Sequence, residues 1–533
     1  MQVALSRPSR LARHRTRALR TIGAEPARLV LRWLARVKQS PACTRHLLEF
    51  LLVYGAALMT YALLASNWGP LHVDLTEMWA WGKEFELGYL KHPPFAAWIA
   101  GLWFTVMPRT NWSFYLLATL NGAVGLAGVW ALAGLLLGPF GRWASMLVLV
   151  LTPSFTITAL KFNCNAPLLS TWPWAAYFFV ASLQTRRAVF GAAAGLLTAA
   201  ALLTKYSSVF LLASFFFAAL LHPERQRYFR SPAPYVAVAA GLAAIAPHVW
   251  WGFSTGFSTL DYAAWKTLAA AAGRDNSVRA IFLALSSLGI ATGVLAMIFG
   301  AEIRSIFQRS VAGSFHRRAQ WVACLAAGPF LFTIAAYLFG GVRVTSSYLI
   351  PTLYALPLAF LFTSGVEITF VTIRQLVLSI AAVWLPLLLA SPLLGYWMWN
   401  NAGKAWLEPR QEIAAAATRM WHDMYRQPLR FVSGSEDLAK AVTFYSPDAP
   451  SFLLLTSPFG REMSVSEARR REGVLFICRR VDDFCVQSVN ALVDERAFRY
   501  THVFAPHFLR RAAEPEPFVF ILQPPAPCTD NTC

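Results

Sequence analysis

The sequence predicts an α-helical membrane protein with a small soluble α/β domain at its C-terminal end. Of its 533 residues, 56% are hydrophobic and 14% are charged, and the mean hydropathy is +0.46. Soluble globular proteins carry about 25% charged residues, so this composition excludes an ordinary soluble enzyme and a disordered chain alike. Apolar runs of bilayer-spanning length recur over most of the chain, and ordinary soluble composition follows. We therefore expect a basic N-terminal segment over 1–46, a transmembrane domain over 47–399 and a soluble domain over 400–533.

The N-terminal segment carries much of the positive charge. Residues 1–46 hold eleven Arg or Lys residues and a single acid, Glu25, in a chain whose formal net charge is +20. The first apolar run follows at once over 47–66, and such a basic flank indicates a cytoplasmic N-terminus by the positive-inside rule. The basic region is longer than that of a cleaved signal peptide, so we expect an uncleaved anchor. A nucleic-acid-binding arm is the alternative interpretation, but the adjacent span disfavours it, and no nucleic acid is expected as a partner.

Eleven apolar runs predict about eleven transmembrane helices. They lie at 47–66, 114–138, 142–160, 166–184, 189–204, 206–221, 235–253, 280–300, 319–340, 347–364 and 375–397. Loops rich in basic residues alternate with poorer ones, as the positive-inside rule requires of a multi-pass protein. The basic loops contain Arg142, Arg186, Arg187, Arg225, Arg227, Arg230, Arg304, Arg309, Arg317 and Arg318. An odd number of spans places the tail outside, so we expect a bacterial inner-membrane protein with a periplasmic C-terminal domain.

The tail predicts a small α/β domain. Its short strands are expected at 429–434, 451–456, 473–478 and 518–522, and a helix with a Ser/Glu start signal is expected at 435–446. Four cysteines in this tail indicate disulfides, because an extracytoplasmic compartment is oxidising. The short spacing favours a Cys478–Cys485 pair, with Cys528–Cys533 as a second. A zinc site is the alternative, but neither pair has the C-x-x-C spacing typical of such sites.

Polar residues gather in the first outer loop, over 67–113. This segment contains Asp74, Glu77, Lys91 and His92 among many aromatic residues. Residues 94–107 are apolar but too short to span a bilayer comfortably, so we expect a helix that lies in the interface there. The tryptophans of the loop suit that depth, and an interfacial belt is their plainest interpretation.

Further polar residues fall at later outer turns, namely Asn165, Lys205, His248 and Arg343. Ionisable residues at membrane depth are costly and often functional. Lys205 stands between two short apolar stretches, which predicts a hairpin of short helices with Lys205 at its outer tip. Each residue also has a plainer interpretation. Lys205 would snorkel to the interface, His248 would be a satisfied core histidine, and Asp74 would mark a helix start.

The first outer loop resembles a known family. Its pattern is similar, without a gap, to D-E-x-Y-Y-W-x-W…G-Y-x-D-H-P-P at Asp74, Trp79, Trp81, Gly88, Tyr89, His92, Pro93 and Pro94. This pattern is found in the polytopic glycosyltransferases of superfamily C, families 39 and 83, which use lipid-linked sugars. They include the lipid A aminoarabinose transferases and the dolichyl-phosphate-mannose protein mannosyltransferases. The segments NCNAPLLSTWPW, from Asn163, and LLTKY, ending at Tyr206, resemble two further family motifs, and the resemblance covers roughly residues 47–400.

The resemblance implies both the chemistry and the residues that perform it. It implies a polyprenyl-phosphate-sugar donor, a hydroxyl acceptor, inversion at the anomeric carbon and a catalytic face outside the cytoplasm. Asp74 is the expected general base, because a carboxylate within hydrogen-bond reach can take the acceptor proton. The lipid phosphate leaves as an anion and needs cations near it. The expected donor- and substrate-binding residues are Lys205, Arg343, Lys91, His92, Asn165, Glu77 and His248.

The sequence departs from the family pattern at three positions. Leu75 follows Asp74 where the family often has Glu, Lys91 replaces an Asp, and Asn165 stands in the place of a second acid. A role that needs two carboxylates, such as divalent metal binding, is therefore disfavoured. No cofactor is expected.

The expected function is transfer of a monosaccharide, a hexose or a pentose, to a lipid or envelope glycan. A protein hydroxyl, as in a protein O-mannosyltransferase, is the alternative acceptor. A transporter or flippase for lipid-linked sugars is the alternative class of protein. Its usual sequence pointer is a matched pair of interrupted spans, and the stretch around Lys205 has no matching partner. Membrane lipids are expected as further partners.

Overall fold

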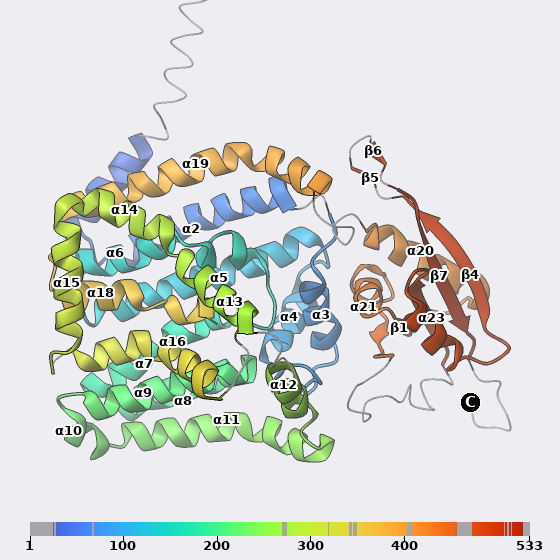
Figure 1. Ribbon diagram of the computed structural model, residues 1–533, viewed down its shortest axis with the longest axis horizontal. Helices are drawn as coiled ribbons and strands as arrows, with labels where there is room; N and C mark the ends of the chain where they lie inside the picture. The colour runs from blue at the N-terminus through green and yellow to red at the C-terminus, as the bar shows by residue number, and fades with distance from the viewer. Residues whose placement is uncertain are drawn as a thin grey trace, which may run out of the picture.

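A computed structural model describes residues 25, 28–66, 69–268, 274–317, 319–340, 344, 349–401, 408–455, 472–505, 507–508, 511–512 and 514–525. Arg343, Cys528 and Cys533, which the sequence singled out, lie outside these residues, so their predicted roles remain predictions. A bundle of helices forms the larger body, and a small sheet domain packs against one end of it (Figure 1).

The bundle begins with a helix over 28–39. Its further α-helices are α2 Thr44–Tyr61, α3 Val73–Gly82, α4 Phe95–Val106, α5 Asn111–Gly134, α6 Pro139–Leu149, α7 Leu168–Thr185, α8 Ala188–Thr204, α9 Val209–Leu221, α10 Arg225–Phe229, α11 Ala233–Thr255, α12 Ser258–Leu268, α13 Arg274–Ser286, α14 Gly289–Phe299, α15 Ile303–Ser314, α16 Gln320–Gly340, α18 Leu356–Ser364 and α19 Phe370–Asn401. Short π and 3₁₀ segments extend or join them at η1 Ala62–Ser66, η2 Pro153–Phe155, η3 Ile157–Leu160, η4 Tyr206–Ser208, η5 Gly300–Glu302 and η6 Ile350–Leu353. One continuous apolar core joins most of these helices, and many large apolar side chains remain exposed on their outer surfaces. Such a surface suits contact with lipid.

Each predicted apolar run coincides with a helix or a pair of helices. Within the described residues, six helices are long and apolar enough to cross a membrane, or seven if a pair bent by 89° is one span. They are Thr44–Ser66, Asn111–Gly134, Ala233–Thr255, Ser277–Ser314, Gln320–Gly340 and Phe370–Asn401, and the bent pair is Pro139–Leu149 with Pro153–Leu160. The protein is thus a multi-pass membrane protein. The predicted count of eleven spans is not confirmed, because several of the runs form shorter helices.

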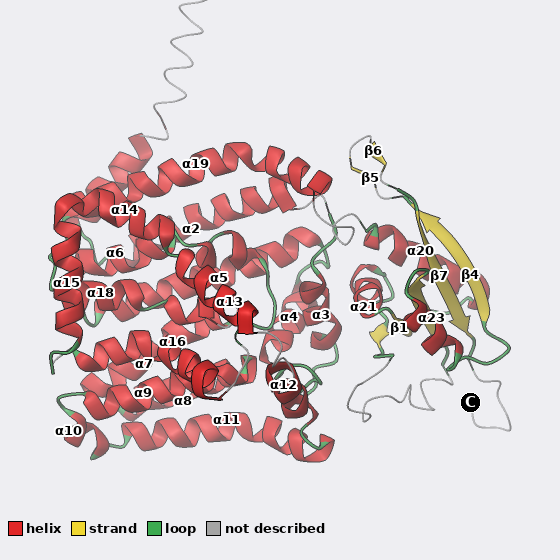
Figure 2. Ribbon diagram, in the orientation of Figure 1, coloured by secondary structure: helices red, strands yellow, loops and turns green. Residues whose placement is uncertain are grey.

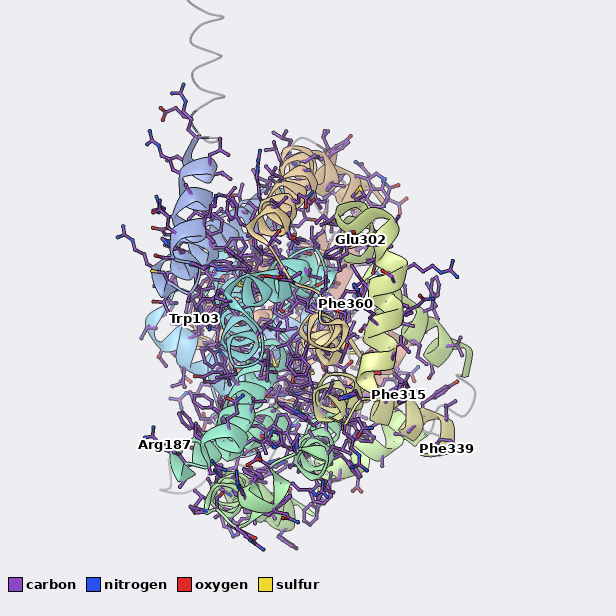
Figure 3. The ribbon with its side chains drawn as sticks, turned by 90° about the vertical axis from the view of Figure 1, so that its left-hand side faces the viewer. Trp103, Arg187, Glu302, Phe315, Phe339 and Phe360 are labelled. Atoms are coloured by element: carbon purple, nitrogen blue, oxygen red, sulfur yellow. A yellow bond between two sulfur atoms is a disulfide. The ribbon has the colours of Figure 1, made fainter. Side chains whose placement is uncertain are left out.

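The helix ends separate into two groups. Helices α10 and α15 lie at one end of the bundle, whereas α3, α12 and the sheet domain lie at the other (Figure 1). Figure 3 views the molecule from the first end and labels Arg187, Glu302 and Phe315. The basic loops around α10 and α15 are therefore far from the polar outer turns, as the charge pattern predicts. Which end faces the cytoplasm stays a prediction.

The predicted interfacial helix at 94–107 is α4, which packs directly against α3 through small residues. A Cβ at Gly82 would lie 2.2 Å from the carbonyl oxygen of Ala97, and one at Gly101 would lie 2.3 Å from that of Gly82. Only glycine therefore allows the two backbones to approach so closely. This contact fixes the C-terminal end of α3.

The C-terminal domain contains a five-stranded mixed sheet (Figure 2). Its strands are β1 Phe431–Gly434, β2 Ser451–Phe452, β3 Val474–Arg479, β4 Phe498–Phe504 and β7 Glu516–Gln523, in the order β2-β1-β3-β7-β4. Strand β1 pairs in parallel with β2 and β3, and β7 pairs antiparallel with β3 and β4. Its helices are α20 Arg410–Tyr425, α21 Glu436–Tyr445 and α23 Asp483–Asn490, and a two-stranded ribbon joins β5 His507–Phe508 to β6 Arg511–Ala512.

Most of this domain follows the sequence pattern. The four predicted strands are β1, β2, β3 and β7, and the predicted helix is α21, so these predictions are confirmed. The predicted disulfide is also present, between Cys478 of β3 and Cys485 of α23. Strand β4 was not predicted, because it lies at the sheet edge and six of its seven residues are exposed, so no apolar alternation marks it.

Candidate active site

Asp74 lies in the first turn of α3, at the end of the bundle that faces the sheet domain. Its side chain is 35% exposed, and its Oδ2 lies 2.8 Å from Nζ of Lys161. The amide of Asn163 donates to the same oxygen at 3.3 Å. The residue that caps α3 is His72, whose Nδ1 lies 3.1 Å from the backbone nitrogen of Asp74. The interpretation of Asp74 as the helix cap is therefore wrong, and its carboxylate is directed at the second outer loop instead.

The surroundings of Asp74 keep its carboxylate ionised. Burial raises the pKa of Asp74, but the ammonium of Lys161 outweighs that effect, with smaller contributions from His72 and Asn163, and the pKa lies below its ordinary value. Lys161 also lies 3.2 Å from Nε2 of His72. Burial together with this ammonium lowers the pKa of His72 and favours its neutral form.

The second outer loop connects Asp74 to Lys205. The side-chain oxygen of Asn163 accepts from the backbone N–H of Asn165 at 2.9 Å, and Oδ1 of Asn165 accepts from Nζ of Lys205 at 2.6 Å. Lys205 follows the last residue of α8, where the chain turns through η4 into α9. We call the five residues Asp74, Lys161, Asn163, Asn165 and Lys205 the Asp74 cluster. It brings one carboxylate and two ammonium groups into one hydrogen-bonded network.

His248 of α11 is held on both ring nitrogens. Its Nδ1 lies 2.7 Å from the carbonyl oxygen of Leu87, and its Nε2 lies 2.8 Å from the hydroxyl of Tyr206. The ring stacks on Trp251, with centroids 5.6 Å apart. His248 is 7% exposed, so it is a satisfied buried histidine that connects the first outer loop, α11 and η4.

An apolar cavity of about 180 Å³ lies beside His248. It is lined mainly by α8, α11 and the start of α12, through Leu202, Leu203, Tyr206, Ile245, Trp251 and Leu260 among others. Tyr206 is the neighbour of Lys205 in the chain. The cavity therefore opens an apolar space next to the cationic end of the Asp74 cluster.

Glu77 and Lys91 contact the C-terminal domain. Nζ of Lys91 lies 3.4 Å from Glu77 and forms an ion pair with Glu436 at the start of α21. Lys440, one turn later, forms ion pairs with both Glu77 and Glu436 and is 1% exposed. We call these four residues the interdomain ion cluster. Two carboxylates and two ammonium groups alternate in it, so no buried charge lacks a counter-ion.

The charges of this cluster reinforce one another. Burial raises the pKa of Glu436, but Lys440 and Lys91 outweigh it, and the pKa is lowered. Burial lowers the pKa of Lys91, but Glu77 and Glu436 outweigh it, and the pKa is raised. Glu436 and Lys91 are thus charged at neutral pH.

Contacts other than ion pairs also dock the same helix onto the bundle. Arg109 donates to four carbonyl groups at the end of α21, at 2.9–3.4 Å, which are those of Thr443, Phe444, Ser446 and Pro447. A cation near a helix C-terminus is favourable, because the free carbonyl groups there carry partial negative charge. The Phe444 ring packs on Phe104 at 5.5 Å, within the aromatic core of the bundle. Helix α21 is therefore seated on the bundle by charge, hydrogen bonding and apolar packing together.

A cavity of about 340 Å³ lies between the bundle and the docked domain. It is lined by residues 80–91 that end α3 and follow it, by the end of α11, and by α21 and β2. We call it the interdomain cavity. It begins where α3 ends, whereas the Asp74 cluster surrounds the start of the same helix.

The structure places the predicted residues in distinct positions. Asp74, Asn165 and Lys205 share one network, whereas Glu77 and Lys91 lie in the interdomain ion cluster. His92 packs edge-on against Trp81, at 5.9 Å, and against Tyr262. The prediction that these residues all bind donor or substrate stays a prediction.

Sequence reasoning gave no role to Lys161, Glu436 or Lys440. Lys161 stands two residues before Asn163, and that nearness to a family motif was the available signal. Glu436 and Lys440 lie in a soluble helix more than 300 residues from Asp74. Their burial against the bundle has no signature in the local sequence.

The residues around Asp74 do not fit a divalent cation. Ca²⁺ and Mg²⁺ need several oxygen ligands with negative charge, but Asp74 is paired with the ammonium of Lys161. Within the described part of the chain, no three His, Cys, Asp or Glu side chains are placed to hold a metal ion.

Known proteins resemble this chain in sequence. The family described as dolichyl-phosphate-mannose-protein mannosyltransferase matches residues 91–251. The lipid A galacturonosyltransferase RgtD of Rhizobium johnstonii is 27% identical over 226 residues, which are 41% of this chain and 47% of that protein. The chain thus spans about half the length of the curated relative that it matches.

Solved structures share the fold. ArnT from Cupriavidus metallidurans bound to undecaprenyl phosphate has a TM-score of 0.57 at 15% identity, covering 89% of this chain and 97% of that one. The apo state of ArnT has a TM-score of 0.55 at 13% identity, covering 89% and 98%.

Over residues 91–251 the chain is similar to the dolichyl-phosphate-mannose-protein mannosyltransferases, which are polytopic glycosyltransferases of superfamily C. The resemblance carried by the first outer loop is thereby confirmed. The family match extends from Lys91 to Trp251, so it includes Asn165, Lys205 and His248 but not Asp74. The superfamily is one of membrane glycosyltransferases, which agrees with the helices that are long enough to span a bilayer.

Proposed function

We propose that the protein transfers a monosaccharide from a polyprenyl-phosphate-sugar donor to a hydroxyl group of a lipid or envelope glycan. The observation that carries the proposal is the Asp74 cluster, in which an ionised carboxylate and two ammonium groups share one network at one end of a membrane bundle. That combination provides a proton acceptor for the incoming hydroxyl and cations for the departing phosphate. The relatives named for lipid A and for dolichyl-phosphate-mannose support the same class of reaction.

The reaction is a single inverting displacement at the anomeric carbon. The acceptor oxygen bonds to that carbon as the bond from carbon to the phosphate oxygen breaks. Asp74 takes the hydroxyl proton, a role that contributes typically 10²–10⁴-fold to rate. The lipid phosphate leaves as an anion, stabilised by Lys161 and Lys205.

Donor binding would also activate the base. Lys161 holds the pKa of Asp74 below its ordinary value. A phosphate placed between Lys161 and Lys205 would draw the Lys161 ammonium toward itself and weaken its pairing with Asp74. The pKa of Asp74 would then rise, because its strongest counter-ion is shared. The carboxylate would become a better base only when donor is bound.

The apolar cavity supports a lipid-linked donor. It lies next to Tyr206 and Lys205, and its lining is almost entirely apolar. A prenyl chain there would extend from a phosphate held by Lys205. We place this site on the periplasmic face of the bacterial inner membrane, because the basic loops lie at the opposite end of the bundle.

The test is transfer of radiolabelled sugar by purified protein in detergent, from polyprenyl-phosphate-sugar to an extract of envelope lipids. Asp74→Asn should lower turnover by about 10²-fold or more and leave the thermal midpoint nearly unchanged, because Asp74 is not the helix cap. Asp494→Asn is the matched control, since Asp494 is 45% exposed and its carboxylate pairs with the nearby Arg496. Near-normal transfer by folded Asp74→Asn protein would exclude Asp74 as the general base.

The same assay separates the alternative functions. A transporter or flippase would give no covalent sugar product with any acceptor. A protein acceptor, which the name of the matching mannosyltransferase family suggests, would give labelled protein in place of labelled lipid or glycan. Comparison of envelope lipids and glycans from a deletion strain and its parent by mass spectrometry would then identify the product.

A further inference from the structure

The interdomain cavity exists only because the C-terminal domain is docked. Residues 80–91 form one wall, Trp251 and Thr255 of α11 form a second, and Glu436 with residues 451–454 forms the third. Its volume of about 340 Å³ is at the lower end of the range for small-molecule sites. Neither domain alone contributes all three walls, so the docked arrangement creates the site.

The walls of the cavity are held in place. Trp81 and Tyr89 stack with ring centroids 5.3 Å apart, and the hydroxyl of Tyr89 donates to the carbonyl of Trp81 at 2.7 Å. A Cβ at Gly88 would lie 2.3 Å from the ring of Trp251, so that ring packs directly on the loop backbone. Because the rings are fixed before any ligand arrives, little ordering entropy would be lost on binding.

The lining combines aromatic rings with carboxylates. The rings are those of Trp81, Tyr89, Trp251 and Phe452, and the carboxylates are those of Glu84, Glu86 and Glu436. Aromatic faces bind the apolar faces of sugar rings, and carboxylates accept hydrogen bonds from hydroxyl and ammonium groups. Among the described lining residues, Lys91 is the single basic one, and it is already paired with Glu77 and Glu436. A phosphate in this cavity would meet net negative charge and be repelled.

The cavity also lies at a useful distance from the proposed base. Trp81 follows Asp74 by seven residues of α3, or about 10 Å along the helix axis. That length is about the end-to-end length of a disaccharide. A sugar ring bound in the cavity would let the next unit present its hydroxyl near Asp74.

The geometry points to the interdomain cavity as an acceptor subsite for a sugar ring that bears hydroxyl or amino groups and no phosphate. The acceptor role rests on the proposed function. The binding of such a sugar depends only on the residues that line the cavity. In this arrangement the donor phosphate binds ammonium groups near the start of α3, and the acceptor sugar binds carboxylates and aromatic rings near its end.

Ligand-detected NMR on the full-length protein in detergent tests the subsite without any donor. The probes are glucosamine, N-acetylglucosamine and glucosamine 6-phosphate. Saturation transfer should reach the ring protons of the first two, and the phosphorylated probe should bind at least about fivefold more weakly, because like charges repel. Equal or stronger binding of the phosphorylated probe would overturn the inference.

Two variants locate the binding. Phe452→Ala removes one ring and should weaken the unphosphorylated probes about three- to tenfold, the range for a single aromatic contact. Glu84→Gln keeps the shape but removes a charge, so the discrimination against the phosphate should decrease. Phe498→Ala is the control, because Phe498 is 49% exposed on β4 and does not line the cavity. Unchanged binding and discrimination in Glu84→Gln would exclude the site even if Phe452→Ala failed to fold.

The transfer assay separates the two proposals. If wild-type protein binds glucosamine in the cavity but transfers no sugar from a polyprenyl-phosphate donor, the proposed function fails alone. If transfer occurs and its acceptor KM is the same in Glu84→Gln and wild type, the acceptor subsite fails alone. The expected result is a higher acceptor KM in Glu84→Gln with unchanged donor KM.

Discussion

The start and the end of α3 differ in the charge of their surroundings and in the part of the chain that supplies the neighbouring residues. At its start, Asp74 meets Lys161 and the amide of Asn163, all supplied by outer loops of the helical bundle. At its end, Trp81 and the carboxylates that follow it face a second domain, whose Lys440 is buried between Glu77 and Glu436. The first region is cationic around a single carboxylate, and the second is acidic and aromatic.

In the proposed reaction, this difference separates two tasks that one active site would combine. A lipid phosphate needs positive charge and a nearby apolar space, and both occur beside Lys205. A sugar acceptor needs hydrogen-bond acceptors and ring faces, and these occur in the interdomain cavity. A domain that is replaced or reshaped could change the acceptor without altering the donor site. The following predictions test whether the two regions are energetically independent.

The largest effect on stability is expected from Lys440→Met. This change leaves Lys91 as the one remaining counter-ion of the carboxylates of Glu77 and Glu436 within the interdomain ion cluster. Breaking a buried ion pair costs about 3–5 kcal/mol. Docking of α21 should weaken by about 3 kcal/mol, visible as faster proteolysis of the C-terminal domain. Donor binding by the Asp74 cluster should persist. Arg496→Met is the control, because an exposed pair contributes only about 0–1 kcal/mol.

A smaller loss is expected from removal of the disulfide. The Cys478–Cys485 bridge closes a loop with a sequence separation of seven, for which the chain-entropy model gives about 2–3 kcal/mol. The double variant Cys478→Ser with Cys485→Ser should lower the thermal midpoint of the C-terminal domain. Donor affinity should not change, since the bridge lies outside the bundle. Loss of donor affinity would show that the sheet domain supports both regions.

A more local effect is expected from Asn165→Ala. The change removes the oxygen that accepts from Lys205 at 2.6 Å, and a hydrogen bond to a charged group contributes about 1.5–3 kcal/mol. Donor KM should rise about tenfold, while glucosamine binding in the interdomain cavity stays the same. Asn490→Ala, on the exposed side of α23, is the matched control. A parallel loss of glucosamine binding would contradict the independence of the two regions.

The smallest effect is expected from pH between 5 and 9. The lowered pKa of Glu436 means that its stabilisation is present above its ordinary value of about 4.3 and is lost only as pH falls through the lowered one. The raised pKa of Lys91 means that its stabilisation is present below about 10.4 and is lost only as pH rises through the raised one. Scanning fluorimetry should therefore show a thermal midpoint for docking that varies by less than about 2 °C. A marked fall of this thermal midpoint between pH 7 and pH 5 would show that docking depends on ionisable groups other than Glu436 and Lys91.

The sequence predicted the positions of helices and strands better than it predicted the number of transmembrane helices. Strands β1, β3 and β7 and helix α21 followed from local pattern, because their apolar periodicity is strong. The count of eleven spans is not confirmed, since a run such as 142–160 breaks into α6, η2 and η3 with a bend of 89°. Pro153 follows the end of α6 at this bend, and proline disrupts a helix. Hydropathy measures apolar length and does not report such breaks.

The sequence by itself determined the membrane class, the family resemblance and the position of Asp74, because composition and short motifs are local properties. Only the tertiary structure decided which residues accompany Asp74 and what Lys91 does. Lys91 departs from the family pattern, and its partner Glu436 lies 345 residues away. Pairing of charges across such a separation depends on how α21 docks onto α3, which is set by the fit of two apolar surfaces and a buried ion cluster. No local pattern encodes that fit, since the paired residues Glu77 and Lys440 lie 363 positions apart in the sequence.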